Sequence, residues 1–275
     1  MENTPWRLIP FRQETGAFQM AADECLAVSE GARPTLRLYQ WEPYALSLGY
    51  HQSHGTINFE QCSQAGIDVV RRPTGGRAVF HADELTYAVI LPLHSPLAGG
   101  GIPAVHNRIS LALAEGIRQS GVDITLRVQS DNLREHYSAS AAGELCFSSS
   151  TKHELQIGGK KVVGSAQRQF SANILQHGSI LLGPAHEDIA TLLNLSPAGQ
   201  ATVRAGMKSS TTCLKEHLSA PPDIGDLTAS IIRAFQRQFN CECIRQDFSD
   251  TELRTIQASV QNYSLSTEYV SYHPS

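Results

Sequence analysis

Arg71–Tyr87 reads Arg-Arg-Pro-Thr-Gly-Gly-Arg-Ala-Val-Phe-His-Ala-Asp-Glu-Leu-Thr-Tyr, and this stretch carries the strongest fold signal in the chain. An apolar run at 68–70 precedes it and a second one, at 85–91, ends it, so a glycine pair joins two predicted strands. Glycine lets backbone amides approach a ligand closely, and the three arginines of the stretch supply guanidinium donors. The combination indicates a site for an acyl carbonyl or a phosphate-bearing carrier; the alternative is a hairpin turn with solvated arginines.

Further blocks of sequence flank this stretch. Downstream lie Gly-Lys-Lys-Val-Val-Gly-Ser-Ala-Gln at 159–167 and Ile-Leu-Gln-His-Gly-Ser-Ile-Leu-Leu at 174–182; upstream lie Phe18–Glu24 and Leu46–Gln52. In this order the blocks resemble the lipoate-protein ligase and octanoyltransferase family, which shares its catalytic fold with biotin-protein ligases. The resemblance covers about residues 5–185.

The fold class that these patterns imply is α+β, a mixed, largely antiparallel sheet with helices packed on it. Short turns join most of the predicted strands, which favours antiparallel pairing. The resemblance implies a biotin/lipoate-protein-ligase-like catalytic domain. We expect this domain at 1–240 and a helical C-terminal extension, packed on it, at 241–275.

Periodicity predicts the elements of this fold. Apolar residues at helical spacing predict helices at 15–30, 58–66, 105–121, 184–195, 223–239 and 249–261. Alternating or continuous apolar runs predict strands at 35–39, 45–50, 122–128, 154–157, 161–166 and 174–182. The polar segment 199–218 has no clear periodicity, and 129–143 is expected to be a loop that overhangs the site.

Charge and composition narrow the class of partner. The net charge of −4 and a pI near 6.2 give no overall basic field, which argues against nucleic acid. No signal peptide and no run of membrane-spanning length is found, so we expect a cytoplasmic protein without membrane contact. The six cysteines follow no metal or disulfide spacing, and we expect free thiols, no metal and no bound cofactor.

Cys146 is the predicted catalytic nucleophile. A thiolate exchanges one thioester for another at little cost in free energy, so a cysteine can be loaded with an acyl group without ATP. The resemblance implies the same residue, because octanoyltransferases directed to glycine cleavage H protein carry their acyl-thioester cysteine at this place. It also implies that Lys161 faces the acyl carbonyl, where its charge would lower the thiol pKa and stabilise an oxyanion. Lys160 would point to the opposite face of the strand.

The remaining site residues come from the matched blocks. The predicted substrate-binding residues are Arg72, Thr74, Gly75, Gly76, Arg77, His81, Gly164, Ser165, Ala166, His177 and Gly178. For the two histidines a hydrogen-bonded structural role is favoured over a role as a base, with His81 orienting the glycine-containing turn.

Four functions are compatible with these residues. The favoured one is transfer of octanoyl from octanoyl-acyl carrier protein, through Cys146, to a lysine of a lipoyl-accepting protein such as glycine cleavage H protein. The others are an ATP-dependent lipoate-protein ligase, a lipoyl amidotransferase between lipoyl-accepting proteins, and a non-catalytic acyl-binding protein.

Overall fold

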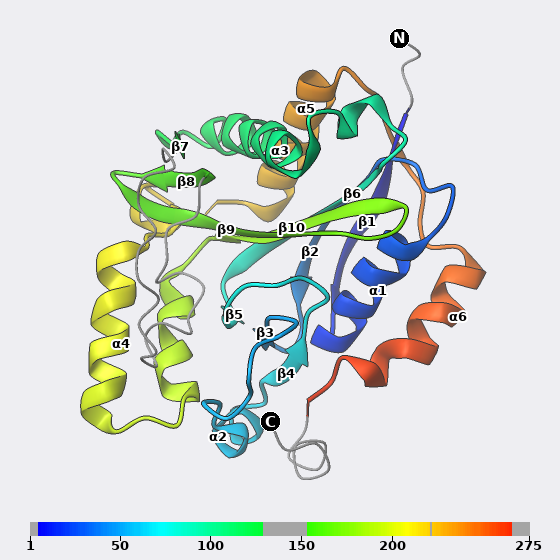
Figure 1. Ribbon diagram of the computed structural model, residues 1–275. Helices are drawn as coiled ribbons and strands as arrows, with labels where there is room; N and C mark the ends of the chain where they lie inside the picture. Colours follow the sequence, from blue (N-terminus) through cyan, green and yellow to red (C-terminus); the bar gives the residue numbers. More distant parts are fainter. Residues whose placement is uncertain (1–4, 129–152, 221, 266–275) are drawn as a thin grey trace.

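An eight-stranded sheet forms the centre of the protein (Figure 1). The structure is a computed structural model that describes residues 5–128, 153–220 and 222–265. The strands follow the order β11 (Cys243–Arg245), β1 (Trp6–Glu14), β2 (Thr35–Trp41), β6 (Glu84–Pro92), β10 (Asn173–Leu181), β9 (Lys160–Gln169), β8 (His153–Ile157) and β7 (Thr125–Val128). Among the described strands of this sheet, the β11–β1 and β1–β2 pairs are parallel and the other pairs are antiparallel. This confirms the predicted mixed, largely antiparallel sheet.

Helices cover both faces of this sheet (Figure 1). On one face lie α3 (Gly101–Arg118) and α5 (Ile224–Phe239); on the other lie α1 (Gly16–Val28) and α6 (Asp250–Ser259). Side chains alternate along a strand, and in β2 Leu36 and Leu38 join the α3/α5 core while Tyr39 and Trp41 join the α1 core. The sheet therefore separates two hydrophobic cores.

A smaller sheet carries the glycine-containing stretch. Its strands have the order β4 (Asp68–Arg71), β3 (Ala45–Leu48) and β5 (Val79–His81), and the short helix α2 (Phe59–Gln64) precedes β4. The predicted strands at 35–39 and 45–50 thus belong to different sheets. The residues between β4 and β5, Arg72–Ala78, form the segment called here the signature loop.

The predicted helices are found, with shifted ends, and several further elements were not predicted. Residues 184–192 wind as a 3-10 helix, η4 (Pro184–Leu192), and α4 (Pro197–Ser210) occupies part of the segment without clear periodicity. In α4 only Val203 and Met207 are buried, so its apolar stripe is too short for periodicity to detect. Strand β1 was missed as well.

The C-terminal part of the chain returns to both sheets. β11 extends the large sheet beside β1, and α6 packs on α1. Farther on, the Arg71 N–H donates to the Tyr263 carbonyl at 2.8 Å and the Leu265 N–H to the Val69 carbonyl at 2.7 Å, so the chain lies along β4. The division into a domain at 1–240 and an extension at 241–275 stays a prediction. In the described parts of the chain, no helix combines the length and apolar character needed to cross a bilayer.

Candidate active site

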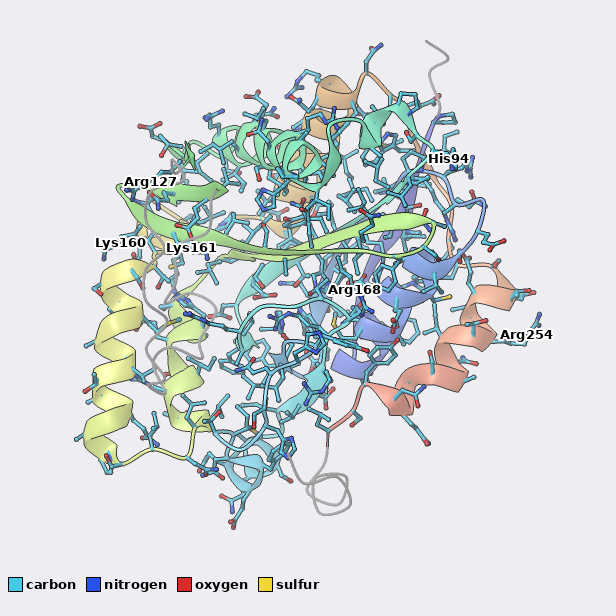
Figure 2. The ribbon with its side chains drawn as sticks, viewed as in Figure 1. His94, Arg127, Lys160, Lys161, Arg168 and Arg254 are labelled. Atoms are coloured by element: carbon cyan, nitrogen blue, oxygen red, sulfur yellow. The ribbon has the colours of Figure 1, made fainter. Side chains whose placement is uncertain are left out.

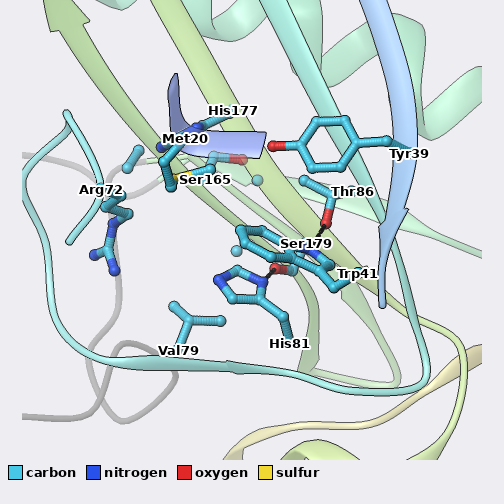
Figure 3. Close-up of a pocket in the computed structure, with 13 residues that line it drawn as sticks. Met20, Tyr39, Trp41, Arg72, Val79, His81, Thr86, Ser165, His177 and Ser179 are labelled. Atoms are coloured by element: carbon cyan, nitrogen blue, oxygen red, sulfur yellow. Dashed lines mark hydrogen bonds between the residues drawn. The ribbon is translucent and has the colours of Figure 1, made fainter. Parts of the chain in front are cut away.

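A cavity lies between helix α1, the adjacent face of the large sheet and the signature loop (Figure 3). The space among its lining atoms, open solvent at its mouth included, is about 360 Å³. The largest apolar side chains of its wall come from α1, β2 and β5. They are Met20, Tyr39, Trp41 and Val79. The rest of the wall is formed by Arg72, His81, Thr86, Gly164, Ser165, Ala166, His177, Gly178 and Ser179.

The polar atoms of the wall are bonded within the protein. The Trp41 indole N–H donates to Thr86 Oγ1 at 2.7 Å, and Ser165 Oγ lies 2.7 Å from the Tyr87 hydroxyl. The Tyr39 hydroxyl donates to Asp23 at 3.1 Å. A buried polar group that already has a partner gains little from a ligand, so the cavity offers mainly hydrocarbon surface. It suits an alkyl chain.

Arg72 organises the signature loop. Its Nε and Nη2 donate to the Gly75 carbonyl at 3.2 and 2.9 Å, Nη2 also donates to the Arg77 carbonyl at 2.7 Å, and Nη1 donates to Ser47. Gly76 has φ +98°, and a Cβ there would lie 2.7 Å from Arg72 Nη2. These contacts explain why this turn needs an arginine and a glycine at these two positions.

His177 links the loop to helix α1. Its Nε2 lies 2.6 Å from Thr74 Oγ1 and its Nδ1 lies 2.7 Å from Asp23 Oδ2. Asp23 is also paired with the buried Arg37 guanidinium. Burial lowers the pKa of His177, against the opposing effect of Asp23. The ring is therefore held neutral in the wall of the cavity.

His81 is held in a similar way on the other side of the loop. Its Nε2 lies 2.7 Å from Ser47 Oγ, its Nδ1 lies 2.8 Å from Glu84 Oε1, and Trp41 stacks on the ring with 4.0 Å between centroids. Both ring nitrogens are thus engaged by protein groups. This geometry favours the predicted orienting role over a role as a base.

Lys161 is buried outside the cavity wall. Its Nζ lies 3.2 Å from Glu154 Oε1, and both side chains are about 95% buried. Lys160 instead donates to the Lys208 carbonyl at 2.8 Å, as expected for the opposite strand face. Figure 2 shows both lysines at one end of β9 and Arg168 toward the other. The amine of Lys161 is thus paired with a carboxylate in the interior of the protein, and removing either partner would leave the other buried without it.

The predicted site residues fall into four groups. Seven lie in the cavity wall: Arg72, His81, Gly164, Ser165, Ala166, His177 and Gly178. Thr74, Gly75, Gly76 and Arg77 lie in the signature loop beside it, and Lys161 lies in β9. Cys146 is outside the described residues. The direct contact of any of them with a substrate stays a prediction.

Sequence reasoning missed part of the wall and its supports. Met20, Thr86 and Ser179 stood within matched blocks without an assigned role, and no motif marked Tyr39 or Trp41. The supports Asp23, Arg37, Glu84 and Glu154 were not assigned either. Their signal is a charged or polar residue at a position that strand or helix periodicity places in the core.

Three thiols among the described residues are poor nucleophiles. Burial raises the pKa of Cys25 and Cys213, and raises that of Cys62 to about 11. Cys243, whose pKa is lowered by a hydrogen bond from Cys241, belongs to β11, two strands from the cavity-lining β2. Within the described ranges, no three His, Cys, Asp or Glu side chains are grouped to hold a metal ion.

Comparison with known proteins identifies the family of this chain and proteins with a similar fold. The model of the lipoyl protein ligase A/B catalytic domain matches residues 15–236. Curated relatives include octanoyltransferase LipM of Clostridioides difficile (strain 630), 34% identical over 94% of this chain and 96% of the relative, and octanoyltransferase LipM of Bacillus subtilis (strain 168), 30% identical over 98% and 99%. A solved lipoate-protein ligase A bound with ATP superposes with a TM-score of 0.72 at 18% identity, over 94% of each chain. A bipartite lipoate protein ligase from Thermoplasma acidophilum, solved in a study of this ligase and its E2 lipoyl domain, gives 0.72 at 17%, over 94% of this chain and 92% of the other.

Proposed function

This chain belongs to the lipoyl protein ligase A/B catalytic-domain family, and we propose that it transfers octanoyl from octanoyl-acyl carrier protein, through a Cys146 thioester, to a lysine of a lipoyl-accepting protein. Octanoyl transfer in lipoate biosynthesis is the activity named for its relatives at 30–35% identity. Glycine cleavage H protein is the proposed acceptor and the cytoplasm the proposed location.

The cavity carries this proposal. Its polar wall residues are bonded to one another or to buried partners, so an inserted alkyl chain would leave no polar group unsatisfied. Burying the methylenes of an eight-carbon chain would contribute roughly 5 kcal/mol at about 0.8 kcal/mol per methylene. Neighbouring chain lengths would differ only modestly.

In the first step the Cys146 thiolate attacks the octanoyl thioester. A new C–S bond forms to Cys146, the old C–S bond breaks, and the carrier leaves as a thiolate. One thioester replaces another, so no nucleotide is needed. A nearby ammonium would favour both the attacking thiolate and the oxyanion, and Lys161 is the proposed source of that charge.

In the second step the acceptor lysine, as a free amine, attacks the acyl group on Cys146. The C–N bond of the amide forms, the C–S bond breaks, and Cys146 leaves as a thiolate. Over the whole reaction the ammonium group of the acceptor lysine loses two protons. The thiolate of the acyl carrier protein takes up one of them, and the other is released to water. Amide formation from a thioester is downhill, which again removes the need for ATP.

The test is acyl transfer with purified components. Octanoyl-acyl carrier protein and apo H protein should give octanoylated H protein without nucleotide. The Cys146→Ser variant should catalyse this transfer at least 100-fold more slowly than the unmodified enzyme. Free octanoate or lipoate with ATP and Mg²⁺ should give none. If Cys146→Ser retains ATP-dependent attachment while the unmodified enzyme transfers nothing from the carrier, the chain is a ligase.

Two further results of this experiment would identify the amidotransferase and the non-catalytic binding protein. If only octanoyl-H protein serves as donor, toward a second lipoyl-accepting protein, the chain is an amidotransferase. If octanoyl-acyl carrier protein binds but no thioester or amide forms under any condition, it is a binding protein.

A further inference from the structure

We infer that Asp23 and His177 are positioning residues for acyl transfer, which act by holding Thr74 and, through it, the signature loop against the cavity. This inference rests on the proposed function. It concerns how the loop is held rather than which residues react.

The three side chains form one hydrogen-bonded line. Thr74 is completely buried and is not part of the cavity wall, while His177 is. The Asp23 carboxylate pairs with the Arg37 guanidinium, and a carboxylate only accepts, so the Asp23 contact assigns the proton of His177 to Nδ1. Nε2 is then an acceptor, and the Thr74 hydroxyl donates to it at 2.6 Å. The line fixes one tautomer of His177 and one direction of the Thr74 hydroxyl.

The far end of the line is rigid. Asp23 has no exposed surface, and its carboxylate accepts from Arg37, from the Tyr39 hydroxyl at 3.1 Å and from His177. Arg37 is itself held by Gln19, one turn before Asp23 on α1. A shift of Thr74 would therefore have to move helix α1 or break a buried hydrogen bond.

The loop backbone around Thr74 is held from other sides. The Thr74 carbonyl accepts from the Tyr50 N–H at 2.9 Å, and the Pro73 carbonyl accepts from Arg168 at 2.8 Å. Arg72 holds the carbonyls of Gly75 and Arg77. The Thr74 side chain is the contact that ties this backbone to the cavity wall and α1, so its loss would loosen the loop on the cavity side.

Protonation of His177 would act on the same line. The charged ring would donate from Nε2, the Thr74 hydroxyl would have to reverse, and a second cation would join Arg72 in the cavity wall. The charged or titratable groups that face His177 are Asp23 on α1, Arg37 and Tyr39 on β2, Arg72 at the end of β4 and His81 on β5. Burial, Arg72 and His81 oppose the proton and Asp23 favours it. Acyl transfer should therefore fall as the pH drops through the folded-state pKa of His177, which lies below the ordinary histidine value of about 6.5.

The test compares Thr74→Val, which keeps the shape and removes the hydroxyl, with Thr74→Ser, which keeps the hydroxyl. Thr74→Val should slow acylation of Cys146 by about 10- to 100-fold through kcat, with a change of less than about threefold in KM, because a displaced reacting group costs rate more than binding. Thr74→Ser should stay within about threefold of the unmodified enzyme. Ser110→Ala on α3 removes another buried hydroxyl bonded to a histidine, at 3.3 Å, on the far side of the sheet, and serves as the control.

Two readouts do not depend on the proposed activity. Amide hydrogen exchange in residues 72–77 should accelerate in Thr74→Val and stay unchanged in Thr74→Ser and Ser110→Ala. Nitrogen chemical shifts of His177 should report the Nδ1–H tautomer in the unmodified protein and, in Asp23→Asn, a change toward Nε2–H. Unchanged loop exchange in Thr74→Val, or an Nε2–H tautomer in the unmodified protein, would overturn the inference.

The outcomes also separate this inference from the proposed function. If the unmodified enzyme takes up octanoyl and Thr74→Val does so at the same rate, the positioning role fails and the function stands. If the unmodified enzyme takes up none while the exchange and tautomer results are as expected, the function fails and the loop contact stands.

Discussion

At the scale of single residues, charge in the interior is balanced by specific partners. Lys161 and Glu154 form a buried pair, as do Arg37 and Asp23. Removing one member of such a pair typically costs 3–5 kcal/mol. Variants that test the electrostatic role of Lys161 must therefore be compared with a variant that removes both charges.

The first prediction concerns the positive charge that Lys161 is proposed to place beside Cys146. Lys161→Met should raise the pKa of the Cys146 thiol, because a positive charge is lost, and Glu154→Gln should lower it, because a negative charge is lost. Lys160→Met should change it little, since Lys160 lies on the other strand face. The measurement is the rate of Cys146 alkylation by iodoacetamide against pH in each variant and in the Lys161→Met/Glu154→Gln pair. Shifts of the same sign in both single variants would contradict the account.

The second prediction concerns two buried histidines. Burial lowers the folded-state pKa of His177 and of His186, whose Nε2 lies 2.8 Å from Thr211 Oγ1. A lowered folded pKa means that the unfolded chain binds more protons, so this stability is fully present above about pH 6.5 and is lost as pH falls toward the folded pKa. Each histidine should contribute a slope of about 1.4 kcal/mol per pH unit in that window. Urea unfolding between pH 5 and 7.5 would measure it; His186→Gln should reduce the slope, whereas replacing the exposed His51 by Gln should not.

At the scale of elements, a glycine lets the end of β3 approach the signature loop. A Cβ on Gly49 would lie 1.9 Å from the Gly76 carbonyl oxygen, which is backbone and cannot rotate away. The end of β3 and the signature loop can therefore meet only through a glycine. The turn gains its shape from this packing as much as from its own residues.

The third prediction follows from that contact. Gly49→Ala should destabilise the protein by about 1–3 kcal/mol or more, because the signature loop must shift. Gly206→Ala in α4 is the matched control, since a Cβ there meets no atom within 4 Å and alanine favours a helix by about 1 kcal/mol. Thermal unfolding of the two variants should thus move in opposite directions. An unchanged midpoint for Gly49→Ala would show that the loop does not sit against β3.

The elements were predictable where one physical signal decided them. The helix at Gly16–Val28 and the strand at Asn173–Leu181 have continuous apolar faces, and both were found by periodicity. Strand β1 was not, because its register is set by β2 and β11, which lie far away in the sequence. The motif glycines and histidines marked the site, but the partners of the histidines, Asp23 and Glu84, depend on packing between elements that no local pattern reports.

At the scale of the whole molecule, the C-terminal part of the chain supports the strand that leads into the signature loop. Tyr263 and Leu265 pair with β4 through backbone hydrogen bonds, and the Tyr263 hydroxyl bonds to Glu24 on α1. Helix α6 adds the Glu252–Arg7 ion pair at 2.6 Å. Residues separated by about two hundred positions thus hold one side of the site.

The fourth prediction tests this support. A chain ending after Ser259 should unfold at a lower temperature and exchange the amides of 68–77 faster, because β4 loses its neighbour. A chain ending after Leu265 keeps these contacts and should lie much closer to the full chain. Equal exchange rates in the two shortened chains would show that the C-terminal contacts do not stabilise the loop.

The central claim is that an octanoyl group resides on Cys146 during the reaction. Intact mass spectrometry of the enzyme after mixing with octanoyl-acyl carrier protein, without nucleotide, measures this directly. The account predicts the gain of one octanoyl mass, its removal by hydroxylamine, and its absence in Cys146→Ala but not in Cys25→Ala or Cys62→Ala, whose thiols are buried. An octanoyl adduct that persists in Cys146→Ala, or that disappears in Cys25→Ala or Cys62→Ala, would contradict it.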